Sequence, residues 1–325
     1  MEANRTVMKS ESFFAVQGKG AIYENLRSNP DHQNIRDFIE EMWEEYWPHA
    51  DLDFLAKARN DDFQARYWEM YVGCSLLRQN TQIEPREQRK ERWGSPDLGP
   101  DFRIIAPHPF WLEATTVWPG TGEDAVPEVE FGVVRDVPDD QLKLRILQSI
   151  RDKAKQRLHF RDKGLIDPTD CYVVAVNIGK VSPISDLEPP RIVRAVFGLG
   201  LPQVSMNVDS GALSDWRYQP QDHIVKQSSS LVSTRIFLDT EQSDHPDYVG
   251  YEGLSAVLSS EMEPFNSCEP WFNHNKYVIG DDYYIVCNPR ATNPLPHGFL
   301  KCGQEYWLNS AEGLESNPWF KDRAS

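Results

Sequence analysis

The chain has 325 residues and a formal net charge of −16. This charge argues against a protein that coats nucleic acid through its overall charge, but it does not exclude a local basic groove. No apolar run reaches the length of a membrane span, and residues 1–20 lack the apolar core of a signal peptide. The five cysteines form no Cys-x-x-Cys pair and the eight histidines lack ligand spacing, so we expect neither a disulfide framework nor a zinc site. A cytoplasmic protein without a membrane segment is expected.

Helical periodicity predicts two helices in the first quarter of the chain, over residues 35–47 and 61–79, each with apolar residues on one face. Glu69 lies on the flank of the second apolar stripe, one turn before Gly73, whose missing side chain leaves room beside the carboxylate. The alternative is an exposed helical Glu near Arg66. The charged segment that follows, residues 84–92, is expected to be a loop.

A β-hairpin is predicted from Gly99 to Thr115, where two β-prone runs flank the turn-rich segment Ala-Pro-His-Pro. Folding this hairpin brings Asp101 roughly opposite Glu113 to Thr115. Directly opposed residues have Cβ atoms about 5 Å apart, and two carboxylates at that separation repel unless a cation lies between them. A hard divalent ion, Mg²⁺ or Mn²⁺, is the natural cation for carboxylate oxygens and water. The alternative is a pair of solvated surface acids.

The irregular stretch 117–140 is rich in Gly, Pro and acids, and is either a substrate-covering flap or a floppy insertion. A long helix is predicted after it, over residues 139–163, with apolar residues recurring every four positions. The helix is basic, against the trend of the chain. Such a helix is most often a solvated face, but its place after the hairpin favours phosphate contact. Its polar flank carries Arg145, Ser149, Lys153 and Gln156.

The continuous apolar run 171–177 predicts a central strand buried on both faces. Hairpin, helix and buried strand together indicate an α/β or α+β sheet domain. Further strands or buried segments are expected at 192–198, 233–238, 256–258 and 283–286. We expect a single domain, with an N-terminal helical extension (1–60), a core (61–180) and a C-terminal elaboration packed on the same domain (181–325).

The chain resembles the PD-(D/E)XK nuclease superfamily, the restriction-endonuclease-like fold, in three features. These are Glu69 on a helix, Gly-Pro-Asp101, and Glu113-Ala-Thr115 on the next strand. The resemblance covers residues 61–177. It implies a mixed central β-sheet flanked by helices, with Asp101 and Glu113 as Mg²⁺ ligands and Glu69 as the additional helix acid of some members.

The sequence departs from this family at Thr115, where members carry a lysine that helps to activate water. Some members place that lysine on the following helix, and Lys153 is the best candidate here. The resemblance then implies a Mg²⁺-dependent phosphodiesterase, an endonuclease-like enzyme acting on DNA, with Arg145, Ser149 and Gln156 contacting phosphates. The alternative is a catalytically inactive nuclease-fold module for binding or assembly. A third reading is an acidic surface that binds a protein partner or a second copy of the chain.

Overall fold

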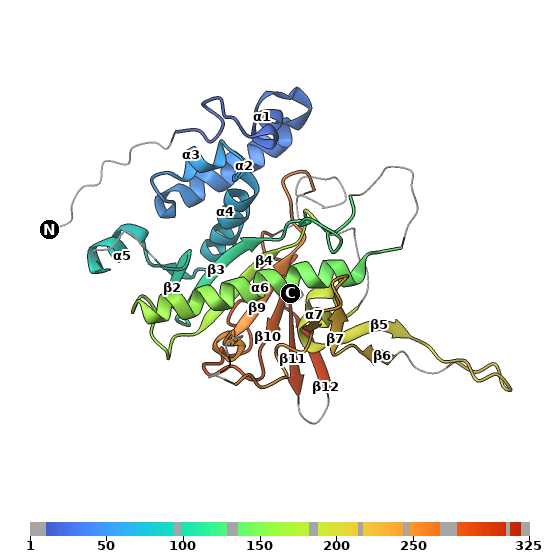
Figure 1. Ribbon diagram of the computed structural model, residues 1–325. Coiled ribbons are helices and arrows are strands. Elements are labelled where there is room, and N and C mark those ends of the chain that lie inside the picture. Colours follow the sequence, from blue (N-terminus) through green and yellow to red (C-terminus); the bar gives the residue numbers. More distant parts are fainter. Residues whose placement is uncertain are drawn as a thin grey trace.

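The computed structural model describes residues 11–93, 99–128, 136–181, 188–213, 217–242, 245, 248–266, 278–309 and 313–319. The protein is a mixed α/β protein built on an eight-stranded mixed sheet (Figure 1). Among the described helices, none is both long enough and apolar enough to cross a bilayer.

The helices confirm the three long segments predicted from periodicity, each within about two residues of the expected bounds. They are α1 (Ala21–Ser28), α2 (Gln33–Tyr46), α3 (Phe54–Ala58), α4 (Phe63–Arg78), α5 (Arg86–Trp93), α6 (Asp139–Asp162) and α7 (Arg191–Phe197).

The loop predicted over residues 84–92 is wrong, because Arg86–Trp93 form helix α5. Arg89 is buried in this segment, and its guanidinium donates to the carbonyl oxygens of Pro100 at 2.6 Å and Asp101 at 2.9 Å. Short helices are marginal without tertiary contacts, and this helix lacks an apolar stripe. Its contacts with the start of the hairpin therefore stabilise a helix that local sequence does not predict.

The main sheet has the strand order β1-β2-β3-β4-β9-β10-β11-β12. Its strands are β1 (Gln82–Ile83), β2 (Phe102–Ala106), β3 (Phe110–Thr116), β4 (Tyr172–Asn177), β9 (Ala256–Ser260), β10 (Tyr284–Cys287), β11 (Gln304–Asn309) and β12 (Gly313–Pro318). The pairs β3–β4, β4–β9 and β10–β11 are parallel and the remaining neighbours are antiparallel. Two small antiparallel pairs lie outside it, β5 (Leu199–Gln203) with β6 (Arg217–Pro220) and β7 (His223–Val225) with β8 (Leu231–Ser233).

The predicted hairpin and the predicted central strand are both confirmed. Strands β2 and β3 pair with Phe102 opposite Leu112, and every residue of β4 is buried. Helix α6 makes the crossover between the parallel strands β3 and β4, as parallel pairing requires. The order along this part of the chain is thus α4, β1, β2, β3, α6, β4, with the short helix α5 between β1 and β2.

Of the strands predicted after residue 190, some are confirmed and others are not. Residues 256–258 and 283–286 fall in or at the start of β9 and β10, whereas only Ser233 of segment 233–238 is in a strand. Segment 192–198 is buried as expected but forms helix α7, which ends where Gly198 adopts a left-handed conformation with φ +67°. Residues 117–128 and 136–138 lack regular structure, and 129–135 lie outside the described residues.

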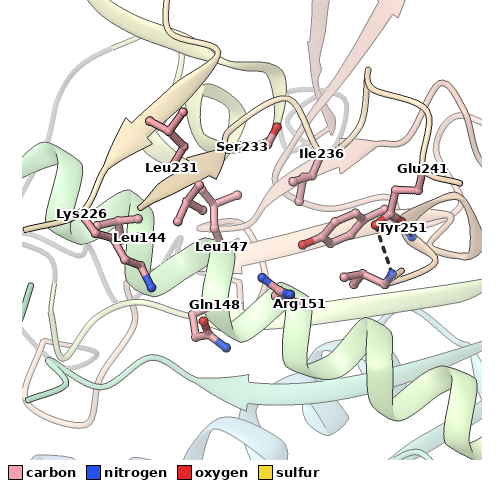
Figure 2. A pocket seen from close by; sticks show the side chains of 12 residues that line it. Leu144, Leu147, Gln148, Arg151, Lys226, Leu231, Ser233, Ile236, Glu241 and Tyr251 are labelled. Carbon is pink, nitrogen blue, oxygen red and sulfur yellow. Dashed lines mark hydrogen bonds between the residues drawn. The ribbon is translucent and has the colours of Figure 1, made fainter. Parts of the chain in front are cut away.

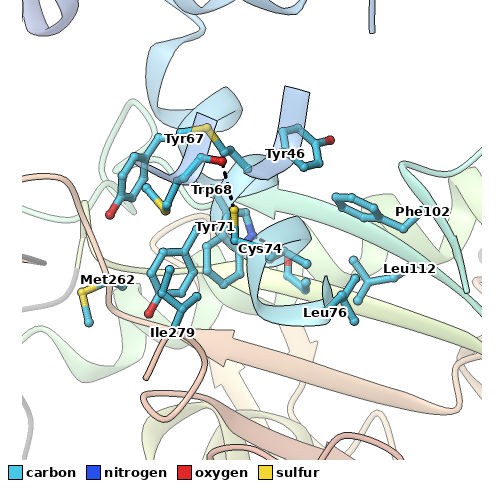
Figure 3. Packing of buried hydrophobic residues seen from close by; sticks show 14 of the residues in the cluster. Tyr46, Tyr67, Trp68, Tyr71, Cys74, Leu76, Phe102, Leu112, Met262 and Ile279 are labelled. Atoms are coloured by element: carbon cyan, nitrogen blue, oxygen red, sulfur yellow. Dashed lines mark hydrogen bonds between the residues drawn. The ribbon is translucent and has the colours of Figure 1, made fainter. Parts of the chain in front are cut away.

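Side chains alternate between two cores along the hairpin. Leu112 joins a cluster with α2 and α4, where Trp68 packs on the sheet and donates from Nε1 to the Ala175 carbonyl oxygen at 3.1 Å (Figure 3). Trp111 joins the cluster on the other face, formed with α6 and α7. Because side chains alternate with a period of two, Glu113 lies on the same face as Trp111, under α6.

Candidate functional site

Asp101 and Glu113 lie side by side at the start of the hairpin. The register that places Phe102 opposite Leu112 places Asp101 next to Glu113. The Asp101 backbone N–H donates to Glu113 Oε2 at 3.2 Å, and the Ala114 N–H donates to Asp101 Oδ2 at 2.8 Å. These backbone contacts hold both carboxylates at one point, between the start of β2 and the middle of β3. The two acids that we expected to converge therefore do so.

Lys153 reaches the same point from helix α6. Its Nζ lies 2.7 Å from Glu113 Oε1 and donates to Gln156 Oε1 at 2.9 Å. Ile150 and Ala154, on the adjacent face of the helix, are fully buried against the sheet. That packing holds α6 over β3, so a lysine on its flank can extend along the helix to the carboxylate.

The electrostatic environment of Glu113 is set by burial and by two neighbours of opposite sign. Its side chain is 6% exposed, against 21% for Lys153. Burial, and then the nearby Asp101 carboxylate, raise the pKa of Glu113, while the ammonium of Lys153 opposes the rise. The ion pair with Lys153 thus favours the charged carboxylate in a place where burial disfavours it. We refer to Asp101, Glu113 and Lys153 as the carboxylate–lysine cluster.

Glu69 projects from α4 and is buried, so the exposed-helix alternative is wrong. It accepts from the Tyr46 hydroxyl at 2.9 Å and forms an ion pair with Arg66. Gly73 makes this possible, because a Cβ there would lie 2.4 Å from the Tyr46 ring. Burial and then Asp101 raise the pKa of Glu69, and Arg86 and Arg66 lower it.

Arg86 of helix α5 connects these two groups of acids. Its guanidinium donates to Asp101 Oδ1 at 3.2 Å and to Glu69 Oε1 at 3.3 Å, and it also pairs with Asp51. Burial alone lowers the pKa of Arg86, but the Glu69 and Asp101 carboxylates together raise it above its ordinary value. Sequence reasoning missed this residue, because it lies in the segment taken for a loop. The available signal was an arginine-rich segment immediately before the acid of the hairpin.

Two of the predicted phosphate-binding residues lie further along α6. Arg145 donates from Nε to the Trp118 carbonyl oxygen at 3.1 Å and packs against Gly120 in the segment after β3. Ser149 is partly exposed on the helix between Arg145 and Lys153. Within the described residues, no hydrogen bond or ion pair joins Arg145 or Ser149 to the two carboxylates.

The residues present fit a divalent cation that keeps most of its water. Each oxygen of Asp101 and Glu113 has one protein donor, and a carboxylate oxygen can accept more than one partner. Mg²⁺ is commonly held by one or two carboxylates with waters and substrate phosphates completing its shell. Glu69 is not part of such a set, because among the described residues these three acids do not place ligand oxygens within 4.8 Å of one another.

A pocket of about 360 Å³ lies on a different flank of α6, against the β7–β8 hairpin (Figure 2). Leu144, Leu147 and Arg151 line it from the helix, and Glu241 also lines it. Glu241 accepts from the backbone N–H groups of residues 249–251, so its carboxylate has a structural role. None of the carboxylate–lysine cluster lines this pocket.

Comparison of the chain with models of protein families, with curated proteins and with solved structures found no match. The fold and the site geometry therefore define the class: a mixed α/β protein with a partly buried cluster of two carboxylates and a lysine at the start of a hairpin.

Proposed function

We propose that the protein is a Mg²⁺-dependent phosphodiesterase, an endonuclease-like enzyme acting on DNA, with the restriction-endonuclease-like core that the sequence resembles. The observation that carries the proposal is the 2.7 Å contact between Lys153 Nζ and Glu113 Oε1. Thr115 cannot provide the positive charge that the resembled site requires, and Lys153 supplies a charge at the neighbouring carboxylate from the following helix. The succession α4, β1, β2, β3, α6, β4 supports the same core.

The residues of the cluster have separate tasks in this proposal. Asp101 and Glu113 would hold Mg²⁺ or Mn²⁺, which when bound acts as a Lewis acid and lowers the pKa of a coordinated water. Lys153 would position that water or stabilise negative charge on the phosphate. Gln156 accepts from Lys153 and so orients its ammonium. Arg145 and Ser149, on the same flank, would contact neighbouring phosphates of the strand.

Glu69 serves this site indirectly in our proposal. It is 2% exposed and its oxygens are engaged by Tyr46, Arg66 and Arg86. Arg86 in turn holds Asp101 Oδ1. Glu69 would therefore position Asp101 through the guanidinium rather than bind the metal ion.

A second candidate function is a nuclease-fold module that binds nucleic acid or a protein partner without turnover. The charge balance of the site favours it. Three cations lie beside the four acids: Arg66 and Arg86 pair with Glu69, Arg86 with Asp101 and Asp51, and Lys153 with Glu113. Acids whose charge is largely compensated in this way can persist as a structural network.

Incubation with nucleic acid and metal separates the two functions. Supercoiled plasmid, single-stranded DNA and RNA are each incubated with the full chain in Mg²⁺, Mn²⁺ or EDTA. Cleavage of DNA that EDTA abolishes supports the enzymatic function. Cleavage of RNA alone would show that the substrate is RNA and not DNA. Binding in a gel-shift assay without cleavage in either metal would select the module.

A further inference from the structure

A second group of potential metal ligands lies in the other half of the sheet, separated from β3 by β4 and β9. Cys287 is the last residue of β10, and Glu305 lies in the parallel strand β11. Ile285 is opposite Glu305 in the register, so Cys287, two positions on, lies on the same face of the sheet. His297 comes from the connection between the two strands.

The three side chains converge on one carboxylate oxygen. Glu305 Oε1 lies 3.1 Å from Cys287 Sγ and 2.9 Å from His297 Nδ1, and the three ligand atoms lie within 4.8 Å of one another. Ligand atoms around a tetrahedral Zn²⁺ are separated by about 3.3–3.5 Å, given its bond lengths. The two contacts to Glu305 Oε1 therefore need to lengthen by only a few tenths of an ångström. His297 is 55% exposed and is free to make that adjustment.

Glu305 is oriented for this role by its surroundings. It is 1% exposed, and its other oxygen, Oε2, accepts from the Gly298 N–H at 2.8 Å and from Trp319 Nε1 at 2.7 Å. Among the described residues its ion-pair partner is His297 alone, with no lysine or arginine. A buried carboxylate with this little cationic compensation is costly. Hydrogen bonds to the outer oxygen are the arrangement that fixes a carboxylate ligand toward a metal.

The connection that supplies His297 has an unusual form. Parallel strands are normally joined through a helix, but Asn288 to Gly303 join β10 to β11 without one. A connection of this length without regular structure is uncommon in a compact domain and is typically functional. A metal ion bound between its middle and both strands would stabilise the folded chain, because such a site is rarely present in the unfolded chain. A pocket of about 160 Å³, lined by Cys287, His297 and Trp307, adjoins the cluster and leaves space for a water.

We propose that Cys287, His297 and Glu305 bind one Zn²⁺ ion, with a water from the adjoining pocket as the fourth ligand, and that this ion holds the connection against β10 and β11. Thiolate, imidazole and carboxylate are the ligands of zinc sites in proteins. A thiolate ligand disfavours Mg²⁺ and Ca²⁺, which prefer oxygen. This site is independent of the proposed nuclease function.

Metal titration of the full chain tests the site without nucleic acid. The protein is stripped with a chelator and titrated with Co²⁺, which reports thiolate ligation by a near-ultraviolet charge-transfer band and tetrahedral geometry by intense visible bands. Zn²⁺ affinity is then measured by competition with a chromogenic chelator, and the thermal midpoint with and without Zn²⁺ reports the effect on the fold. One equivalent of Co²⁺ with a thiolate band, displaced by Zn²⁺, is the expected result.

Matched variants assign the ligands. Cys287→Ala and His297→Gln should each lower Zn²⁺ affinity by at least about 100-fold, the upper end of the range for changes in the shell outside the ligands. Cys74→Ala, which removes a thiol in α4, and Glu113→Gln, which alters the carboxylate–lysine cluster, should leave it unchanged. If Cys287→Ala does not fold, the half-exposed His297→Gln decides the question. A cobalt spectrum without a thiolate band, or equal affinity in His297→Gln and the parent chain, would overturn the proposal and leave a hydrogen-bonded cluster.

Discussion

Lys153 Nζ lies 2.7 Å from Glu113 Oε1, so one ion pair joins the crossover helix α6 to the strand β3 that it covers. The two residues are forty positions apart in the chain, and the geometry depends on Ile150 and Ala154 packing the helix on the sheet. This contact is common to both candidate functions. What distinguishes them is whether the ammonium acts on a substrate or only compensates a buried carboxylate.

Replacing Lys153 by alanine should reduce metal-dependent DNA cleavage by roughly 10² or more, the scale typical of one positioned catalytic group. The reason is that no other described cation lies within ion-pair distance of Glu113. Single-turnover cleavage of plasmid in Mg²⁺ measures the effect. Lys155→Ala, on the exposed side of α6, is the control and should change only salt-sensitive binding. Equal loss of cleavage in both variants would contradict a catalytic role for Lys153.

Glu113→Gln should abolish cleavage while changing the free energy of unfolding by no more than about 1 kcal/mol. The amide keeps an oxygen for the Asp101 N–H and removes the repulsion between the two acids, whereas Lys153 keeps Gln156 as a partner. Urea denaturation without metal, alongside the cleavage assay, measures both quantities. Glu123→Gln, an exposed acid after β3, is the control for charge. A loss of several kcal/mol would indicate that Glu113 is structural.

Arg86→Leu should destabilise the protein by about 3–5 kcal/mol, the cost of leaving buried charges without their partner. Its guanidinium is 11% exposed and is shared by Asp51, Glu69 and Asp101. The matched control is Lys57→Gln in the exposed pair with Asp53, for which we expect about 0.3–0.5 kcal/mol. Chemical denaturation of both variants measures the difference. A small effect of Arg86→Leu would show that the acids are compensated by other groups.

The sequence was sufficient for those parts of the fold in which local periodicity and burial agree. Apolar residues recur at helical spacing in α2, α4 and α6 and alternate along the hairpin, and each pattern indicates which side of the element faces the core. The contact between Lys153 and Glu113 follows from the same two patterns, because a crossover helix covers the strand before it. The site was predictable to that extent.

Two other features could not be read from local pattern. Helix α5 owes its conformation to contacts of Arg86 and Arg89 with distant residues, so charge alone gave the wrong assignment. The convergence of Cys287 and Glu305 depends on parallel pairing across a long connection, and their spacing in the chain resembles no ligand motif. The histidines and cysteines show no metal-ligand spacing along the sequence, yet the fold brings Cys287 and His297 together beside Glu305.

The stability of the protein should depend on pH through Asp139, the first residue of α6. The Asp139 side chain is 11% exposed. Its carboxylate accepts from Arg194 at 2.7 and 2.8 Å and pairs with Lys143 at 2.9 Å and with Arg191 at 3.1 Å. Burial alone would raise the pKa of Asp139, but the hydrogen bonds from Arg194 and the charge of Lys143 hold it well below its usual range. Its position in the first helical turn also favours a negative charge.

A carboxyl whose pKa is lower in the folded chain than in the unfolded chain contributes stability above the unfolded value, about 3.9, and loses that contribution as the pH falls toward the folded value. Asp139→Asn should therefore be less stable than the parent chain at pH 7 by about 3–5 kcal/mol, since three buried cations lose their common partner. The difference should narrow as the pH falls below about 4, because the unfolded chain then binds a proton at Asp139 while the folded chain does not. Urea denaturation of both proteins from pH 7 to pH 3 measures this convergence, and Asp167→Asn, an exposed acid after α6, is the control. A stability difference that stays constant over this range would show that Asp139 acts through its shape rather than its charge.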